Sequence, residues 1–221
     1  MKKNKNDLFK NIPSCVCQEC NQQKIAFGFT NLVTDKNEAK TLCSVCFNTY
    51  AAQRMGVRPP DPAEFPAVSF TDSIGIEHTF CFEVRLSTGL GIVAREINEL
   101  GAPGYQFSVL QHPSTPAIDV YSLLMKKIRK GLSFRYLKSS YIKDNAVVGR
   151  IEENHNNPTV VIDGIEYSWE EFGQFLTSFT GFNFRLECVD PYDEIDYSSK
   201  VERPDPLWWL PKNEDQESDN R

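Results

Sequence analysis

Two closely spaced pairs of cysteines constrain this 221-residue chain more than any other feature of its sequence. The pairs are Cys17-Gln18-Glu19-Cys20 and Cys43-Ser44-Val45-Cys46. Thiolates separated by two residues approach one ion from a tight turn, and two such turns supply the four soft ligands of a closed tetrahedral zinc site. We therefore predict one structural Zn²⁺ ion as the cofactor, held by Cys17, Cys20, Cys43 and Cys46. A closed site of this kind performs no reaction.

The residues around the two pairs predict a small hairpin followed by a helix. A strand is indicated over residues 24–30 and turn composition over 34–37, so a hairpin should close there. Residues 46–55 favour a helix, with Ser44 placed to cap its start and Gly56 to end it. The helix would thus open at the second cysteine pair.

This order of elements resembles the treble-clef or zinc-ribbon type of four-cysteine zinc finger, over about residues 14–56. The resemblance implies that the four paired cysteines are the metal ligands, on a scaffold that many functions share. One alternative stays open in the first pair, because Cys15 lies two residues before Cys17 and could bind together with Cys20. The equal two-residue gap in both pairs favours Cys17.

Disulfides or free buried thiols are the other interpretations of these cysteines. Disulfides belong to oxidising compartments. The basic N-terminus is not followed by the apolar stretch of a secretion signal, and no apolar run approaches the roughly 18 residues that span a membrane. We therefore expect a cytoplasmic protein that does not bind a membrane.

Length and composition predict two folded units, because 221 residues with 40% hydrophobic content suffice for one substantial core and a small satellite. Four prolines between Val57 and Pro66 indicate a stiff linker that holds the finger at a distance from the larger unit. The expected organisation is a finger at 1–56, a linker at 57–66, a main domain at 67–190 and an acidic tail at 191–221.

The main domain carries more strand than helix signals, which predicts an α+β fold with a mostly antiparallel sheet and about three helices. An Asp163-Gly164 turn and a Ser168-to-Glu171 capping box are the clearest local signals. The segment around them resembles parts of uncharacterised bacterial proteins. The expected elements are a strand at 74–86 bent near Gly75, a helix at 90–100, a strand at 105–110, a helix at 116–130, a hairpin at 159–167, a helix from 169, and a closing strand at 182–186.

Several residues that could suggest chemistry have a structural interpretation. His78 falls on the apolar face of its strand, where a lone histidine is more often a core residue than a ligand or a base. Cys81 and Cys188 sit alone in strand-like segments and are interpreted as buried, inert thiols. Glu170 and Glu171 are adjacent and do not face each other on a helix, so the cap explains them better than acid–base catalysis does.

Basic and aromatic residues alternate from Lys126 to Lys143 with no acidic residue among them. Such a mixture can track phosphates and stack bases. The alternative is that cations at the end of a helix complement its dipole while the aromatic residues alternate into a sheet. The residues in question are Lys126, Lys127, Arg129, Lys130 and Arg135.

The C-terminal tail is acidic and too polar to fold alone, so we expect it to be disordered. It contains Trp208 and Trp209, bracketed by Pro206 and Pro211. Two adjacent tryptophans expose a large apolar area if they are left in water. They are therefore expected to dock, either on the protein's own core or on a partner.

These patterns favour a zinc-stabilised, non-catalytic protein-interaction or adaptor protein with an unidentified protein partner. No nucleophile–base pair or phosphate loop is readable in the sequence. A nucleic-acid-binding regulator that uses the finger and the Lys126–Lys143 stretch is the first alternative. A small hydrolase built around His78, His112 or His155 is the second, because catalytic groups that are distant in sequence can meet in a fold.

Overall fold

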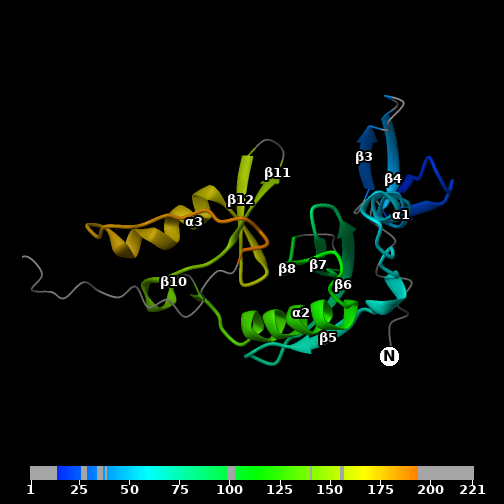
Figure 1. The fold of residues 1–221 in the computed structure, drawn as a ribbon. Helices are drawn as coiled ribbons and strands as arrows, with labels where there is room; N and C mark the ends of the chain where they lie inside the picture. The colour runs from blue at the N-terminus through cyan, green and yellow to red at the C-terminus, as the bar shows by residue number, and fades with distance from the viewer. Residues whose placement is uncertain are drawn as a thin grey trace, which may run out of the picture.

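The fold is α+β and its strands pair only in the antiparallel direction within the described residues, which confirms the predicted fold class. Three α-helices accompany the strands in this part of the chain (Figure 1). They are α1 (Ser44–Met55), α2 (Ala117–Leu132) and α3 (Trp169–Phe175). The computed structural model describes residues 14–25, 29–33, 37, 39–98, 103–139, 141–154 and 157–193.

The N-terminal region consists of two short hairpins and one helix. Its strands are β1 (Ser14–Val16), β2 (Gln23–Ile25), β3 (Phe29–Val33) and β4 (Ala39–Cys43), paired as β1–β2 and β3–β4. Helix α1 follows β4 directly and ends at Gly56, whose φ of 66° is the left-handed cap that glycine favours. The expected cap by Ser44 is wrong, because the helix begins at Ser44 and the capping position belongs to Cys43.

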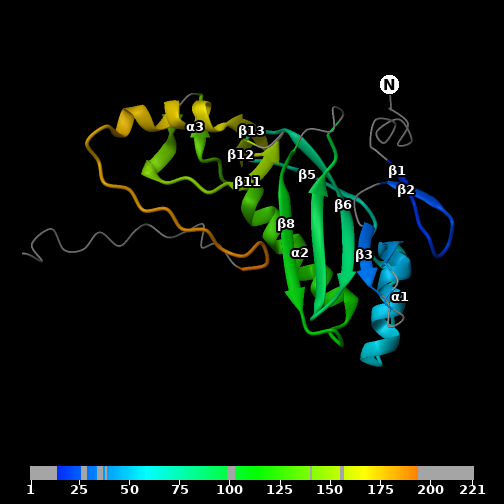
Figure 2. The same cartoon turned by 90° about the horizontal axis from the view of Figure 1, so that it is seen from above.

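A four-stranded antiparallel sheet forms the centre of the molecule. Its strands follow one another in space as in sequence: β5 (Val68–Thr71), β6 (Glu77–Leu86), β7 (Leu90–Glu96) and β8 (Gln106–Gln111). Helix α2 crosses one face of this sheet, as the two views show (Figure 1, Figure 2). Phe80 and Ile92 from the sheet and Leu124 and Ile128 from the helix have no measurable exposure. The main core therefore lies between the sheet and α2.

The expected helix at 90–100 is wrong, because residues 90–96 form the central strand β7. A short apolar run has no periodicity that distinguishes a buried helix from a buried strand. A Cβ at Gly89 would clash with the Gln111 carbonyl oxygen at 2.6 Å, and a Cβ at Gly91 would press on the hydroxyl end of Tyr192 at 3.0 Å. The absence of a side chain at these two glycines lets neighbouring atoms approach the backbone closely.

Strand β6 is shorter than the expected strand at 74–86. It begins at Glu77, and the chain turns before it at Gly75, whose φ is 88°. Ile74 and Ile76 therefore lie in the turn and stay exposed. In α2, Ile118 is 67% exposed, whereas Met125 and Ile128 are buried against the sheet.

The segment between the finger and the sheet packs against the core. It contains the 3₁₀ helix η2 (Pro62–Glu64), and the ring of Phe65 lies 6.1 Å from the ring of Tyr121 in α2. Phe65 is buried. The proline-rich segment therefore lies on α2 and does not space the two regions apart.

Helix α1 also touches the sheet directly, beside β6 (Figure 2). Strand β5 pairs with β6 only as far as Phe80, so the rest of β6 has a free edge. The side chain of Asn48 covers this edge, donating to the Val84 carbonyl at 2.8 Å and accepting from the Leu86 amide at 2.8 Å. One amide side chain thus completes the hydrogen bonding of the strand where its neighbour ends.

The C-terminal unit is a three-stranded meander with a helix. Asp163 and Gly164 have φ values of 52° and 75°, which confirms the expected two-residue turn, and Ser168 and Glu171 form both bonds of the expected capping box. Its elements are β9 (Leu137–Lys138), β10 (Tyr141–Ile142), η3 (Lys143–Asn145), β11 (Arg150–Asn154), β12 (Asn157–Ile162), β13 (Ile165–Ser168), α3 and η4 (Leu176–Phe179).

The expected closing strand at 182–186 is wrong, since these residues pair with no described strand. Phe184 in this segment is 90% exposed. The chain then returns to the face of the sheet opposite α2, where the Ser108 hydroxyl donates to the Pro191 carbonyl. None of the helices in the described ranges has both the length and the apolar character needed to cross a membrane.

Candidate metal centre

Four cysteine sulfurs meet at one point in the N-terminal region. The Sγ atoms of Cys17, Cys20, Cys43 and Cys46 all lie within 4.8 Å of one another, and those of Cys20 and Cys43 are 4.0 Å apart. Cys17 and Cys43 are buried, whereas Cys20 and Cys46 are half-buried. Both sequence pairs therefore contribute to a single cluster, which lies at the rim of the finger with two thiols against protein and two toward solvent.

The first pair sits in a tight turn between β1 and β2. The Cys17 amide donates to the Gln22 carbonyl at 3.1 Å, and the Asn21 amide donates back to the Cys17 carbonyl at 2.9 Å. Asn21 adopts a left-handed φ of 55°, which asparagine tolerates. Gln18 ties this turn to β4 by exchanging two hydrogen bonds with the backbone of Thr41, at 3.1 and 2.7 Å.

The second pair lies where β4 ends and α1 begins. Cys43 is the residue before the first helical turn, and Cys46 lies within that turn. Helix N-termini carry unpaired amides and a partial positive charge that stabilise anions. The Cys43 amide donates to the sulfur of Cys17 at 3.3 Å, so the two pairs are joined by a direct hydrogen bond.

The surroundings of Cys17 and Cys46 shift the pKa values of these two thiols in opposite directions. Burial raises the pKa of the Cys17 thiol, but hydrogen bonds from the backbone amides of Cys20, Cys43 and Glu19 outweigh it and lower the pKa to about 6. Burial raises the pKa of Cys46, as do its hydrogen bonds to the neighbouring thiols. Cys17 is thus prepared to ionise, whereas a bound cation would have to displace the proton of Cys46.

The remaining cysteines lie outside the cluster. Cys15 is exposed in β1, so the structure brings Cys17 and not Cys15 to the other three. Cys81 is partly buried, and its burial raises its pKa, in agreement with an inert thiol. Cys188 is exposed, and its interpretation as a buried thiol is wrong because the strand expected around it does not form.

Little apolar surface supports the cluster. Leu42 is the buried apolar side chain that packs with Cys17 and Cys43, and Phe29, Leu32 and Phe47 are partly buried against them. The cysteines therefore make up much of this small core themselves.

The structure confirms that His78 is a core residue and shows which side chains surround it. The residue is 7% exposed in the core, as expected, but it lies between two acids. Its Nδ1 is 2.6 Å from Oε1 of Glu96, and its Nε2 is 3.3 Å from Oδ2 of Asp72. The Asp72 carboxylate also accepts from the amides of Ile74 and Ile76. This buried polar cluster ties the turn before β6 to the end of β7.

The candidate nucleic-acid-binding residues spread in different directions. Lys127 donates to the Ser108 carbonyl of β8 at 2.8 Å, whereas the Arg129 guanidinium lies 5.3 Å from the ring of Phe70 in β5. These strands are the opposite edges of the sheet. Lys126 and Lys130 are exposed on α2, and Arg135 is half-buried after it.

The remaining candidates that the structure describes make contacts within their own turn or cap. His112 contacts the Ser114 hydroxyl at 2.7 Å in an exposed turn, and Glu171 is held by its cap. His155, Trp208 and Trp209 lie outside the described residues.

Comparison with known proteins gives families without assigned activity. Three family models match successive parts of the chain: Domain of unknown function (DUF7685) over residues 16–58, Domain of unknown function (DUF7686) over 62–133, and Domain of unknown function (DUF7713) over 131–193. The four cysteines all fall in the first match. No curated protein matches the chain. No solved structure matches it either.

Proposed function

We propose that Cys17, Cys20, Cys43 and Cys46 bind one structural Zn²⁺ ion in a treble-clef-like finger, and that the chain is a non-catalytic protein-interaction protein. The observation that carries the metal is the convergence of four sulfurs within 4.8 Å. Four thiolates around one point are the donor set of structural zinc. When bound, the ion would cross-link the turn after β1 to the start of α1.

Elemental analysis tests the metal directly. The purified chain should contain one zinc per polypeptide, and Cys43→Ser should release it. Cys15→Ser is the matched control, because Cys15 is an exposed cysteine outside the cluster, and it should leave the zinc content unchanged. Iron in place of zinc, or no metal in a chain purified under reducing conditions, would contradict the proposal.

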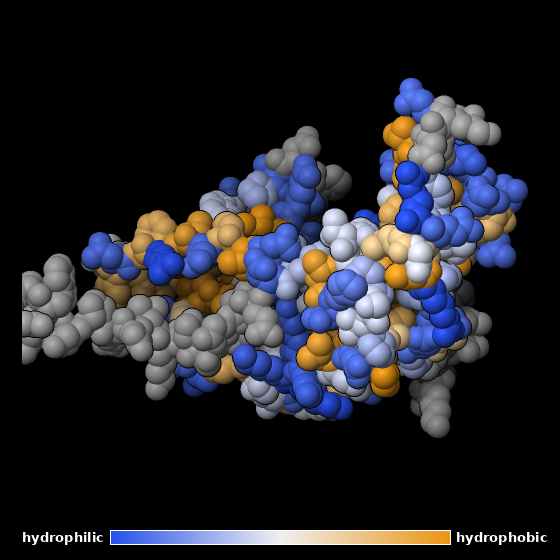
Figure 3. Space-filling view, in the orientation of Figure 1, coloured by the Kyte–Doolittle hydropathy of each residue, from blue (hydrophilic) through white to orange (hydrophobic). Residues whose placement is uncertain are grey.

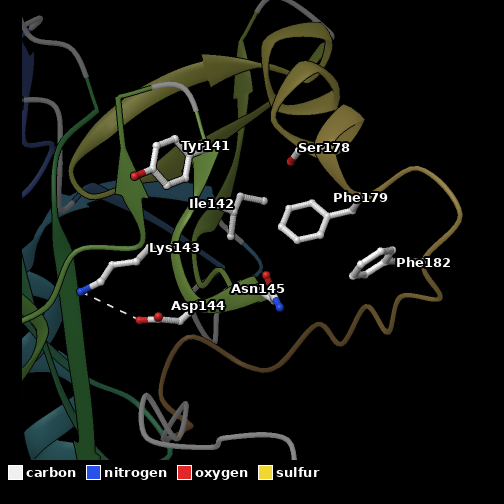
Figure 4. A pocket seen from close by; sticks show the side chains of 8 residues that line it. All are labelled: Tyr141, Ile142, Lys143, Asp144, Asn145, Ser178, Phe179 and Phe182. Carbon is white, nitrogen blue, oxygen red and sulfur yellow. Dashed lines mark ion pairs between the residues drawn. The ribbon is translucent and has the colours of Figure 1, made fainter.

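The interaction role is supported by the apolar surface of the C-terminal unit. An open hollow of about 560 Å³ lies between β10 and η4 (Figure 4). The apolar side chains that line it are those of Ile142, Phe179 and Phe182. Tyr141 also lines it and is 45% exposed. Apolar side chains gather over α3 and the adjoining part of the surface (Figure 3). Exposed apolar patches with polar rims mark protein interaction sites.

Photo-crosslinking tests this surface in the full-length chain. A benzophenone amino acid in place of Tyr141 should form a crosslink to another polypeptide in cells. The same amino acid in place of Asp119, which is exposed on α2, should not. Equal crosslinking at both positions would mean that the hollow is not the interaction surface.

Nucleic acid binding is the second candidate, favoured by the exposure of Lys126, Arg129 and Lys130 on one helix. Phosphate binding releases counterions, so affinity should fall by roughly 10³-fold or more between about 50 and 200 mM salt if many phosphates are contacted. We expect weak binding that disappears at physiological salt. Tight binding there that is lost when these three residues become alanine would favour a nucleic-acid-binding regulator.

A further inference from the structure

Residues 183–189 form an extended segment whose backbone pairs with no other described strand. The segment leaves η4 and runs back toward β8 (orange in Figure 2). Within the residues that the structure describes, its amides and carbonyls make no backbone hydrogen bond. An extended backbone of this kind is a template for pairing with another strand.

The side chains of this segment alternate as those of a half-buried strand do. Phe182, Phe184 and Leu186 are 67, 90 and 67% exposed. Asn183, Arg185 and Glu187 lie between them in the sequence. Successive side chains of a strand point to opposite faces, so the sequence has one apolar and one polar face, and the apolar face lies in water. A partner that adds a strand would cover it.

Both ends of the segment are held in place. At its start the Phe182 amide donates to the Phe179 carbonyl at 2.9 Å, and the two rings are 5.8 Å apart. At its end Pro191 accepts from Ser108 and Tyr192 lies over Gly91 of β7. A segment fixed at both ends loses less conformational entropy when it pairs, which favours binding.

We propose that the partner is a second copy of this chain, paired antiparallel through residues 183–189 about a two-fold axis at Leu186. The proposal goes beyond the interaction function above, because it assigns a separate surface to contact between copies of this chain. In this register Leu186 faces Leu186 of the other copy and Phe184 faces Cys188. Arg185 faces Glu187, and the symmetry makes this pair twice.

Charge selects this register over its neighbours. An axis at Arg185 would place two arginines directly opposite each other, which is destabilising in a sheet. An axis at Phe184 would place Arg185 opposite Asn183 and leave Glu187 opposite Gly181, without charge pairing. Arg185 and Glu187 already contact each other at 3.0 Å in one chain, and their side chains are 84 and 62% exposed, so exchanging partners requires little desolvation.

The size of the contact predicts a weak dimer. Even with roughly 200 Å² from each Phe184 ring, the two short strands bury less than the roughly 1,200 Å² of a stable complex. Association should therefore depend strongly on protein concentration.

Charge reversal tests the proposal in the full-length chain. Arg185→Glu and Glu187→Arg should each be monomeric by sedimentation velocity at concentrations where the wild-type chain dimerises. An equimolar mixture of the two variants should form a heterodimer, because each reversed residue then faces its opposite charge. Both side chains are exposed, so the circular dichroism of each variant should match that of the wild type.

Cysteine crosslinking fixes the register. In a chain with Cys15→Ser and Cys188→Ser, Leu186→Cys should oxidise rapidly to a disulfide-linked dimer, because residue 186 faces itself. Asn183→Cys in the same background should not. A dimer this weak should have a millimolar dissociation constant. A wild-type chain that stays monomeric up to about 1 mM would therefore overturn the proposal.

Two other results would also overturn it, and each names a different occupant. A dimer that is insensitive to both charge reversals would use another surface. A dimer that is lost on deleting residues 204–221 would mean that the tryptophan-containing segment is the occupant. The crosslink from position 141 should persist in Arg185→Glu, so the interaction surface and the dimer strand can fail independently.

Discussion

The finger and the central sheet reach a folded state by different means. Among the described residues, the core of the sheet and α2 contains fifteen buried residues, whereas the core of the finger contains three, two of which are cysteines. Burying one large apolar side chain contributes about 1.5–3 kcal/mol, and ordering one residue costs about 1–2 kcal/mol. A sheet with many such side chains can offset its ordering cost. The three buried residues of the finger cannot do the same, so the proposed metal would have to supply the missing stabilisation.

The two regions nevertheless share a border. Ala52 of α1 belongs to the main core, and Asn48 of the same helix completes the edge of β6. Helix α1 is therefore stabilised from two sides, by the cysteine cluster at its start and by the sheet along its length. This predicts that losing the metal unfolds the hairpins more completely than the helix.

Removing the metal should have the largest effect on stability. The loss of structure should be confined to the finger side of this border. Structural zinc contributes about 10–16 kcal/mol to small zinc domains. In Cys43→Ser, hydrogen exchange measured by mass spectrometry should show rapid exchange over β3 and β4 and unchanged protection over β6 to α2. A metal-free chain that keeps β3 and β4 protected would show that the finger needs no ion.

A cavity in the sheet core should have the converse effect. Phe80 has no measurable exposure and contacts the rings of Phe70 and Phe107. Phe80→Ala should lower the free energy of unfolding by about 3–5 kcal/mol, as phenylalanine truncations in cores do. Zinc content should stay at one per chain. Leu110→Ala, at a position 39% exposed on the other face of the sheet, should cost much less in the same urea titration.

A substitution at the border between α1 and β6 should have an intermediate effect on stability. Asn48→Ala leaves the Val84 carbonyl and the Leu86 amide without their partner, and an unsatisfied buried polar group costs about 1–3 kcal/mol. We expect a loss of about 2–3 kcal/mol and faster exchange in both α1 and the end of β6. Thr49→Ala is the control, because its hydroxyl is exposed and bonds within the helix. Equal losses of stability from the two substitutions would mean that the Asn48 hydrogen bonds do not stabilise the contact between α1 and β6.

Features that depend on local chemistry could be predicted from the sequence. The cysteine spacing located the cluster, and the turn at Asp163 and the cap at Ser168 were readable because each depends on residues within four positions. The treble-clef-like fold stays a prediction, because the order of hairpins and helix is compatible with more than one fold. The identity of the metal also stays a prediction, because four sulfurs can bind more than one metal.

Features that depend on distant partners could not be predicted. His78 is oriented by residues six positions before and eighteen positions after it, and no periodicity connects the three. The alternation at 182–186 predicted a strand, but a sequence period shows which face of a strand would be buried and not whether the chain contains its neighbour. That difference turns a wrong secondary-structure prediction into a candidate binding segment.

The smallest effect we expect is a pH-dependent loss of stability on replacing the buried carboxylate of Asp72. Burial raises the pKa of Asp72, but hydrogen bonds from the Ile76 and Ile74 amides and the nearby His78 outweigh it, so the pKa is lowered in the folded chain. A lowered carboxyl pKa stabilises the fold at every pH above the unfolded value of about 3.9, and this stabilisation is lost as the pH falls through the folded pKa.

Asp72→Asn should therefore reduce stability by about 1–2 kcal/mol at neutral pH, since the amide oxygen can still accept from both the Ile74 and the Ile76 amides but carries no charge. The difference from the wild type should shrink as the pH is lowered from about 5 to below 3. Asp144→Asn is the control, because Asp144 is exposed and lies 3.9 Å from Lys143, and its pH profile should follow the wild type. The measurement is urea unfolding at each pH, followed by far-ultraviolet circular dichroism. A difference that grows in acid would mean that the pKa of Asp72 is raised in the folded chain and that its carboxylate is not what ties the turn before β6 to β7.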